Sequence, residues 1–357
     1  MKKKYVIHMG NAPDMVGGIT TVINKIISTK KMPEYEFKTI YTVTTKFKVL
    51  KFIESIFKLS YLIILNKVEA VHLHMATRGS FYRKTILILI LKIYKIPVIL
   101  HSHGAEFQKF YDNLPRILKK YANYSLNKAN AIIVLTDSWK EYYGNFIKHS
   151  DKIEVIGNFI NLPKQEFDRN YNSNEVKILF LGRLGKRKGT YDLIDACEIL
   201  KKEKINFVLV LAGDGEIEKC KSIIHEKELE KNIKIVGWIS GERKVEYLKE
   251  SDILTLPSYY ESFGVALIEG MSYKLPIVAS TGGQMYEVIR ENIDGILIEP
   301  GNSLQLAEAL KKLIEDSELR KKFGENGYTH VKECFIEQVI IGKYRDVYKR
   351  VIKSRIN

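Results

Sequence analysis

Glu261 and Glu269 lie eight residues apart in a stretch that reads PSYYESFGVALIE. Glu261 precedes a predicted helix. The first amides of that helix, on Phe263, Gly264 and Val265, would have no partner within it. A carboxylate beside several amides can bind neutral hydroxyls such as those of a sugar ring. Glu269 would lie about two helical turns further on, among apolar residues. A carboxylate there requires a partner such as a ribose diol; the alternative is a surface residue on an amphipathic helix.

A second stretch reads LGRLGKRKG over residues 181–189 and mixes glycines with four cationic side chains. It follows a predicted strand and leads into a predicted helix, whose positive end attracts anions. Arg183 can donate a forked pair of hydrogen bonds to a phosphate, and Lys188 can supply a point charge. The pattern indicates a clamp for a diphosphate; the alternative is a solvated basic loop.

Two loops in the first half of the chain could add to such a site. Gly17 and Gly18 open a helix directly after the first predicted strand, where backbone amides can approach a phosphate closely. An ordinary strand-to-helix turn would give the same pattern. His103, followed by Gly104, closes another predicted strand and could face a ligand, although an isolated histidine is more often structural.

A repeating strand–helix pattern surrounds these residues and predicts parallel sheets. In the first half we expect strands at 4–9, 37–43, 70–74, 97–101, 131–135 and 153–156. In the second half we expect strands at 176–181, 207–212, 233–236, 253–256, 277–279 and 295–298. The polar segment 161–175 interrupts this pattern and is typical of a linker.

The sequence therefore predicts an α/β protein with two Rossmann-like, doubly wound domains, which would cover residues 1–160 and 176–335. Ligands bind such sheets at the carboxyl ends of the strands, so we expect the two domains to face a shared cleft. Residues 336–357 would form a C-terminal helix that could return to the N-terminal domain.

The net charge of +15 is concentrated in the first half of the chain. Residues 1–170 hold 27 Lys and Arg against 13 Asp and Glu, whereas residues 171–357 hold 30 against 29. Such asymmetry suggests an anionic partner: a phosphorylated substrate, an anionic membrane surface or nucleic acid. A Lys-rich genome is the alternative, although it should enrich both halves.

A cytoplasmic location, with access to the inner face of the cell membrane, is the expectation from three further features. The three cysteines fit neither a disulfide framework nor a zinc site, which favours a reducing compartment. No secretory signal is evident at the start of the sequence. The longest apolar run, residues 86–100, is interrupted by charges and a proline and is too short to span a membrane.

The N-terminal domain is also where an acceptor is expected. Arg78, Arg83 and Lys84 follow a predicted strand and could bind an anionic acceptor such as a lipid diphosphate. Residues 46–67 alternate lysines with large apolar residues, as in a basic amphipathic helix that lies on a membrane. The alternative for this segment is a core helix with solvated lysines.

Taken in order along the chain, these motifs resemble those of glycosyltransferase family 4, the retaining enzymes with the GT-B fold. The resemblance covers roughly residues 5–330 and rests on an E-x7-E pair, a G-R-L loop ending in Lys-Gly, a Gly-Gly loop and a His-Gly pair. It implies that Arg183 and Lys188 hold the donor diphosphate, with Gly17 and Gly18 near the phosphates. Glu261 and the amides of residues 263–265 would hold the sugar, Glu269 the ribose, and His103 would face the reacting carbon. The sequence departs from the family at Gly157-Asn158, where Asn-Gly is common, so Asn158 receives no role.

The resemblance implies transfer of a hexose-type sugar from a UDP-sugar, or alternatively a GDP-sugar, to a saccharide or lipid-linked saccharide in surface polysaccharide or glycolipid biosynthesis. No Asp-x-Asp motif stands at a suitable strand end, so we expect neither a metal nor another cofactor. A GT-B phosphorylase and a sugar-nucleotide epimerase are alternatives on the same scaffold. A nucleic-acid-binding protein is a further alternative, but no nucleic-acid-binding module is recognisable, and this function would leave the paired glutamates unexplained.

Overall fold

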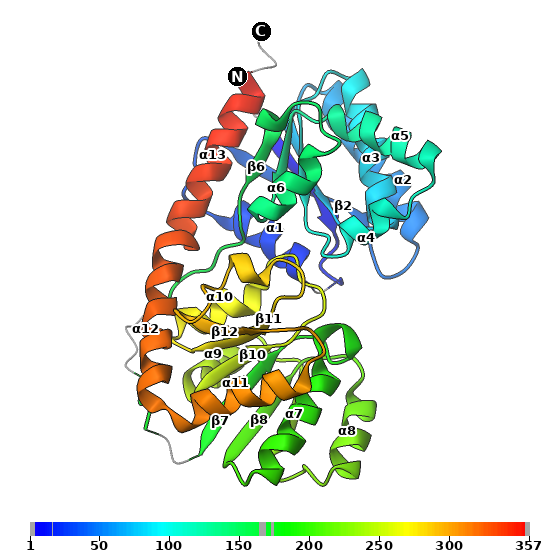
Figure 1. Cartoon of the computed structure of the whole chain (residues 1–357). Helices are drawn as coiled ribbons and strands as arrows, with labels where there is room; N and C mark the ends of the chain where they lie inside the picture. The colour runs from blue at the N-terminus through cyan, green and yellow to red at the C-terminus, as the bar shows by residue number, and fades with distance from the viewer. Residues whose placement is uncertain (1–3, 16, 164–168, 173–174, 354–357) are drawn as a thin grey trace. The chain divides into compact units, whose positions relative to one another are not determined.

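The computed structural model describes residues 4–15, 17–163, 169–172 and 175–353 of the chain. It divides the chain into two units, each with one six-stranded parallel sheet (Figure 1). Unit 1 comprises Met1–Asn158 together with Gln338–Asn357, and unit 2 comprises Phe159–Glu337. The predicted fold class, two doubly wound α/β domains, is confirmed. 

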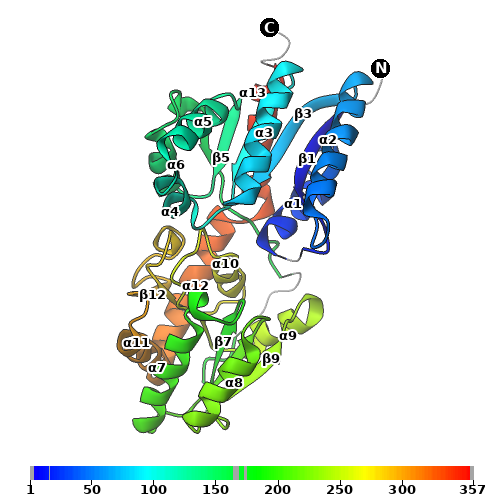
Figure 2. The same cartoon turned by 90° about the vertical axis from the view of Figure 1, so that its right-hand side faces the viewer.

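Unit 1 has the strand order β2-β1-β3-β4-β5-β6. Its helices flank the sheet (Figures 1 and 2). The strands are β1 (Tyr5–Asn11), β2 (Glu36–Val43), β3 (Val68–Met75), β4 (Val98–Ser102), β5 (Ala131–Val134) and β6 (Ile153–Val155). The helices are α1 (Gly18–Ser28), α2 (Lys48–Ile64), α3 (Gly79–Ile93), α4 (Phe107–Asp112), α5 (Arg116–Asn127), α6 (Asp137–Gly144) and α13 (Glu337–Lys353).

Unit 2 has the strand order β12-β11-β10-β7-β8-β9. Its strands are β7 (Val176–Leu181), β8 (Phe207–Ala212), β9 (Ile233–Gly237), β10 (Ile253–Leu256), β11 (Ile277–Ser280) and β12 (Gly295–Ile298). Its helices are α7 (Thr190–Lys202), α8 (Ile217–Glu226), α9 (Gly241–Glu250), α10 (Val265–Ser272), α11 (Ser303–Glu315) and α12 (Ser317–Cys334).

All twelve predicted strands are present, with their bounds shifted by three residues at most. Helices cover both faces of a parallel sheet, so its strands are largely apolar and stand out in the sequence; all six residues of β8 are apolar and buried. The short helix α4 and the polar helix α12 were not predicted. The described part of the segment predicted as a linker packs on unit 2, where Arg169 donates to the carbonyls of Leu248 and Tyr273.

Helix α13 supplies the C-terminal part of unit 1. Its tyrosines Tyr344 and Tyr348 are buried against the sheet, and its Arg345 forms an ion pair with Glu34 at 2.8 Å. Helix α13 therefore contributes to the core of unit 1 together with the elements from the first half of the sequence.

The strand orders fix where each unit can bind a ligand. In unit 1 the order reverses between β1 and β3, and in unit 2 it reverses between β7 and β10. The loops that leave two such strands diverge to opposite faces of the sheet and leave room for a ligand at their carboxyl ends. The predicted site residues follow β1, β3, β4, β7 and β10.

Four histidines lie inside the sheet of unit 1 rather than on its surface. His8, His72, His74 and His101 are at most 1% exposed. His8 is paired in register with His72, and His74 with His101, so the side chains lie side by side across three strands. Burial lowers the pKa of all four, to about 3 for His8, because the charged imidazolium loses its hydration.

This burial predicts that acid destabilises unit 1 selectively. Each of the four imidazoles is neutral when folded but binds a proton below about pH 6.5 when unfolded, so stability is lost as the pH falls below that value. The expected loss is about 1.4 kcal/mol per pH unit for each histidine. Hydrogen exchange at pH 7 and pH 5, corrected for the intrinsic rate, should show that peptides of β3 and β4 open more readily at pH 5.

Peptides from β8 and β10 of unit 2 provide the internal control, because the described residues of that unit include no buried histidine cluster. Equal loosening of both sheets at pH 5 would contradict the prediction.

Among the described residues, no helix is both long enough and apolar enough to cross a membrane.

Candidate active site

The loops at the carboxyl edge of the unit 2 sheet touch one another backbone to backbone. A β-carbon on Gly213, after β8, would lie 1.8 Å from the carbonyl oxygen of Gly182, after β7. A β-carbon on Gly189, where φ is +68°, would lie 2.0 Å from the carbonyl oxygen of Pro257, after β10. Only glycine allows this approach, and the contacts hold the β7–α7 loop between its two neighbours.

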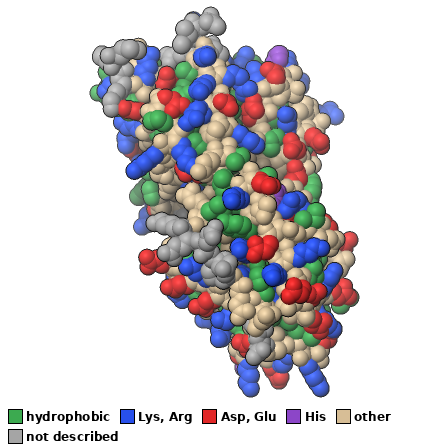
Figure 3. All heavy atoms as spheres, turned by 90° about the vertical axis from the view of Figure 1, so that its left-hand side faces the viewer, with side chains coloured by type: hydrophobic (Ala, Val, Ile, Leu, Met, Phe, Trp, Pro, Cys, Tyr) green, Lys and Arg blue, Asp and Glu red, His purple; other side chains and the backbone are tan. Residues whose placement is uncertain are grey.

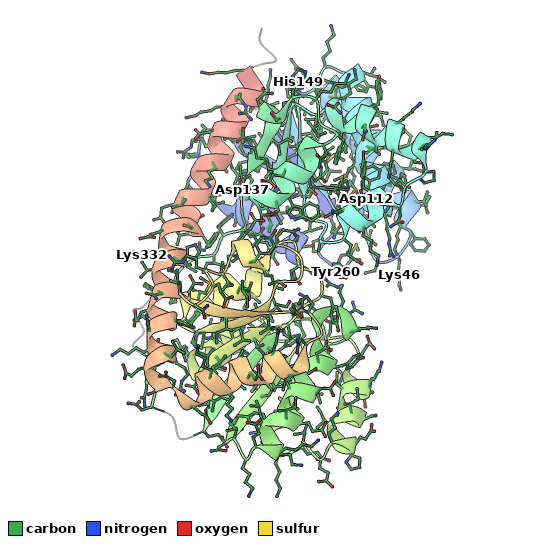
Figure 4. All side chains as sticks on the ribbon, viewed as in Figure 1. Lys46, Asp112, Asp137, His149, Tyr260 and Lys332 are labelled. Atoms are coloured by element: carbon green, nitrogen blue, oxygen red, sulfur yellow. The ribbon has the colours of Figure 1, made fainter. Side chains whose placement is uncertain are left out.

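Lys188 and Glu261, from the two loops at the switch point of unit 2, form an ion pair. Both side chains are largely buried, at 15% and 13% exposure. The guanidinium of Arg187 lies 3.9 Å from the same carboxylate. It also donates to the carbonyl of Tyr260, which is labelled in Figure 4, at 3.1 Å. The carbonyl oxygen of Glu261 accepts from the amide of Gln284 at 3.0 Å, which fixes the loop on its other side.

Arg183 is exposed and makes no ion pair with any described residue, so its guanidinium is available to an anion. It precedes α7, whose N-cap residue is Gly189 and whose first amides have no side-chain cap. Uncapped amides and the positive end of a helix favour phosphate. The structure therefore places Arg183, Lys188 and the start of α7 on one continuous loop.

Helix α10 begins directly after Glu261. Phe263 is buried, and Gly264 occupies the N-cap position with φ +80° and no side-chain cap. Glu269, further along α10, forms an ion pair with Lys244 of α9 at 2.6 Å and remains 20% exposed. The sequence analysis did not find Lys244, because nothing in a charged surface helix marks one lysine as the partner of a distant glutamate.

In unit 1, His103 follows β4 and its amide donates to the carbonyl of Met75, at the end of β3, at 2.8 Å. A β-carbon on Gly104 would lie 2.9 Å from the side chain of Thr77, so glycine allows the loops after β3 and β4 to pack closely. Gly17 and Gly18 begin α1 in open space, with nothing within 4 Å of a β-carbon at either position. Both residues are exposed, as the phosphate hypothesis requires.

The three residues predicted to bind an acceptor are placed very differently. Arg78 is exposed and adopts a positive φ of 53°, an uncommon conformation for a residue other than glycine. Arg83 is half-buried. Lys84 is only 1% exposed, and its ammonium donates to the hydroxyl of Thr42 at 2.6 Å inside the unit. The expectation that Lys84 meets an acceptor is therefore corrected: this residue belongs to the core, and burial lowers its pKa to about 7.

The histidine cluster around His103 was not predicted from the sequence, which pointed to His103 alone. The ring nitrogens of His74 and His103 lie 3.0 Å apart, and those of His8 and His74 also lie 3.0 Å apart. Its signal in the sequence is the alternation of histidines at positions 72 and 74 and again at 101 and 103, since alternate residues of a strand share a face.

Two triplets of this cluster bring nitrogen atoms within 4.8 Å of one another, the spacing of a metal site: His8, His72 and His74, and His74, His101 and His103. Imidazole is a good ligand for zinc or copper. Against such a site, most of the facing nitrogens are already joined by hydrogen bonds, and no carboxylate belongs to either group to offset a buried dication. The cluster fits a hydrogen-bonded network better than a metal centre.

Comparison with known proteins agrees with this geometry. The model of Glycosyltransferase Family 4 matches residues 28–164, and that of Glycosyl transferases group 1 matches residues 163–330. An uncharacterized glycosyltransferase of Methanocaldococcus jannaschii is 27% identical over 354 residues, which cover 94% of this chain and 95% of that protein.

Two further proteins extend the comparison. CapM of Staphylococcus aureus, a capsular polysaccharide biosynthesis glycosyltransferase, is 25% identical over 63% of each chain. The structure of Anabaena HepE in complex with UDP and glucose has the same fold, with a TM-score of 0.77 over 97% of this chain and 99% of that chain, at 16% identity. The resemblance inferred from the motifs is thereby confirmed: the chain belongs to glycosyltransferase family 4 and is a glycosyltransferase.

Proposed function

We propose that this glycosyltransferase moves a hexose-type sugar, with retention, from a nucleotide diphosphate donor to a saccharide or lipid-linked saccharide in surface polysaccharide or glycolipid assembly. A UDP-sugar is the favoured donor, with a GDP-sugar as the alternative. UDP and glucose in the HepE complex support the donor class, and the role of CapM in capsule synthesis supports the acceptor class.

The observation that carries the proposal is the pairing of Lys188 with Glu261 at the switch point of unit 2. A largely buried cation and carboxylate would each need a new partner if a ligand separated them. A sugar diphosphate supplies both, since its phosphate can bind Lys188 while its hydroxyls bind Glu261. Arg183 and the amides at the start of α7 would complete the diphosphate site.

The charge that develops during transfer explains why these groups are cationic. As the bond between the anomeric carbon and the phosphate oxygen breaks, negative charge grows on the diphosphate. Lys188, Arg183 and the helix amides are placed before the reaction begins and stabilise that charge without reorganising. This arrangement needs no metal, and we propose that transfer is metal-independent.

Retention would follow if the acceptor oxygen attacks on the face from which the diphosphate leaves. The new bond joins the anomeric carbon to the acceptor oxygen, and the acceptor proton passes to the leaving phosphate oxygen. In this scheme the phosphate acts as the base, so no nucleophilic carboxylate of the protein is required.

Two substitutions should separate the diphosphate and the sugar parts of the site. Lys188→Ala should weaken UDP and UDP-sugar alike, about tenfold or more, because a hydrogen bond to a charged group contributes about 1.5–3 kcal/mol. Glu261→Gln should leave the affinity for UDP nearly unchanged but weaken the UDP-sugar and abolish transfer. Titration calorimetry with a panel of UDP- and GDP-sugars measures both effects and identifies the sugar.

Lys186→Ala is the matched control, since Lys186 lies exposed in the same loop, and it should bind as the unmodified protein does. Equal loss of UDP affinity in the Lys186 and Lys188 variants would show that only the overall charge matters. Phosphate-dependent cleavage of a disaccharide, or turnover of a nucleotide sugar without acceptor, would replace the transferase by the phosphorylase or the epimerase.

We further propose that unit 1 docks on an anionic membrane surface through α2. This helix buries Ser55, Leu59 and Leu62 against its own unit. Its opposite side exposes a second apolar stripe at three- and four-residue spacing, with exposures of 44–76%: Val49, Leu50, Ile53, Phe57, Tyr61 and Ile64. The structure thus supports both readings of this segment, a core helix and an interfacial one.

Lysines flank the apolar stripe. Residues 46–67 contain five lysines and one glutamate, and the glutamate, Glu54, is neutralised by Lys51 and Lys58. Lys46, labelled in Figure 4, is exposed just before the helix. On the face shown in Figure 3, Lys and Arg are interspersed with Asp and Glu, so charge alone marks no such surface there. Apolar residues beside lysines match an anionic bilayer.

Reversal of the α2 lysines should release the protein from vesicles. Lys46→Glu, Lys48→Glu and Lys58→Glu together should lower binding to phosphatidylglycerol vesicles at least tenfold, because each lysine near an anionic surface contributes about 1 kcal/mol. Phe57→Ser with Ile64→Ser should weaken binding as well, since it removes apolar contact. Vesicle sedimentation measures both.

Lys231→Glu, Lys234→Glu and Lys249→Glu make the same charge change at exposed positions of unit 2 and serve as the control. Equal binding by the α2 and unit 2 variants would rule out α2 as the docking helix.

A further inference from the structure

A continuous set of contacts links His103 to the C-terminal helix of unit 1. The Nε2 atom of His103 lies 3.0 Å from Nδ1 of His74, and Nε2 of His74 lies 3.0 Å from Nδ1 of His8. Nε2 of His8 lies 3.3 Å from the hydroxyl of Tyr348, which lies 2.8 Å from Nδ1 of His72. The distances of 2.8 and 3.0 Å are typical of hydrogen bonds, and the contact of 3.3 Å between His8 and Tyr348 is a long one.

The five side chains that these contacts link, those of His103, His74, His8, Tyr348 and His72, are neutral. Burial lowers the pKa of His103 and of His8 to about 3, and lowers those of His72 and His74 well below the usual range. Burial raises the pKa of Tyr348, so its hydroxyl keeps its hydrogen. A neutral imidazole carries one N–H and one lone pair, so each internal histidine of the chain must donate on one side and accept on the other.

The hydrogens therefore all point one way along the chain. Tyr348 could accept from both of its neighbours only if its own buried O–H had no acceptor, which is unfavourable. Four links therefore join five groups, each with one hydrogen to donate, so one hydrogen remains at an end. One end is Nε2 of His72, which is buried without a hydrogen-bond partner among the described residues. The other end is Nδ1 of His103, a residue that is only partly buried. A buried N–H without a partner is rare and unfavourable, so the remaining hydrogen belongs on His103.

We propose that His103, His74, His8, Tyr348 and His72 form one directional hydrogen-bonded chain that holds the hydrogen of His103 on Nδ1. His103 then presents a hydrogen-bond donor, not a base, at the carboxyl end of β4. His74 is the positioning residue, because it fixes the ring of His103 and occupies its Nε2 atom. All four histidines adopt the Nδ1–H tautomer.

This role rests on the proposed transferase function. A neutral donor at His103 can bind an oxygen of the sugar or of the leaving phosphate, and it cannot remove the proton of the acceptor. The assignment therefore agrees with a reaction in which the leaving phosphate is the base.

The tautomers can be observed directly. In protein labelled with ¹⁵N-histidine, long-range proton–nitrogen correlation distinguishes a nitrogen that bears a hydrogen from one that bears a lone pair, and loss of signals in the His103→Asn variant assigns His103. The expected result is hydrogen on Nδ1 and a lone pair on Nε2 for His103 and His74. Hydrogen on Nε2 of either residue overturns the proposal.

A matched pair of substitutions tests the positioning role. His74→Phe removes two links of the chain, whereas His101→Phe removes none, because both nitrogens of the equally buried His101 lack a hydrogen-bond partner in the described part of the chain. We expect His74→Phe to lower kcat about tenfold with little change in KM for the donor, and His101→Phe to keep kcat within twofold. Equal losses would show that the cluster only maintains the fold.

Replacement of His103 itself separates a donor from a base. The side-chain amide of Asn can place an N–H near the position of Nδ1, so His103→Asn should retain within about tenfold of the original kcat, and His103→Ala should lose about a hundredfold. If His103 were a base, Asn and Ala would be equally inactive, and the proposal would fail.

Zinc titration tests the competing interpretation of the cluster. If stoichiometric Zn²⁺ shifts the signals of His74, His101 and His103 together and a chelator reverses the shift, the cluster is a metal site. The proposed hydrogen-bonded chain is then wrong. The tautomers are observed without turnover. Absence of sugar transfer by the unmodified protein would therefore overturn the proposed function and the role of His103, while the NMR result still decides the hydrogen-bonded chain.

Discussion

The carboxyl edge of the unit 2 sheet has no room for a β-carbon where its loops meet. Gly213 lies against the carbonyl of Gly182, and Gly189 lies against the carbonyl of Pro257. Two loops that touch through their backbones cannot shift relative to each other as flexible side chains would allow. This constraint brings Lys188 to Glu261 although 73 residues separate them. The two charged groups are then in position before any ligand arrives, which is the condition for stabilising a developing charge without reorganisation.

Unit 1 is built from the same α/β arrangement but positions its polar groups in another way. Its histidines lie within the sheet, in register on adjacent strands, and α13 completes the cluster with Tyr348. Buried imidazoles must be neutral, and neutral imidazoles can satisfy one another only in an ordered direction. Unit 2 thus offers charge at loops, and unit 1 offers a neutral donor.

The sequence predicted the elements well because parallel strands are apolar on both faces and the loops between them carry the glycines. It failed at α12, where Gly324 and Gly327 suggest a broken helix; both glycines are buried inside the helix, and a β-carbon on Gly324 would lie 2.2 Å from the carbonyl of Lys274. Close packing thus outweighs helix propensity there.

Among the site residues, the glycine-rich and glutamate motifs are local and could be found. The partners Lys244 and Tyr348 could not be found, because Lys244 lies 25 residues from Glu269 and Tyr348 lies 276 residues from His72. Lys84 was misjudged because its hydrogen bond to the distant Thr42 leaves no mark in the local sequence.

The most direct test of the account is hydrogen exchange of the whole protein with and without UDP, read peptide by peptide. A diphosphate held by the loops at the switch point of unit 2 should slow exchange at residues 182–192 and, with a UDP-sugar, also at residues 261–269. Residues 222–226, in the C-terminal half of α8, lie outside those loops and should be unaffected. Protection confined to unit 1, or none at saturating UDP, would contradict the claim that the Lys188–Glu261 region is the donor site.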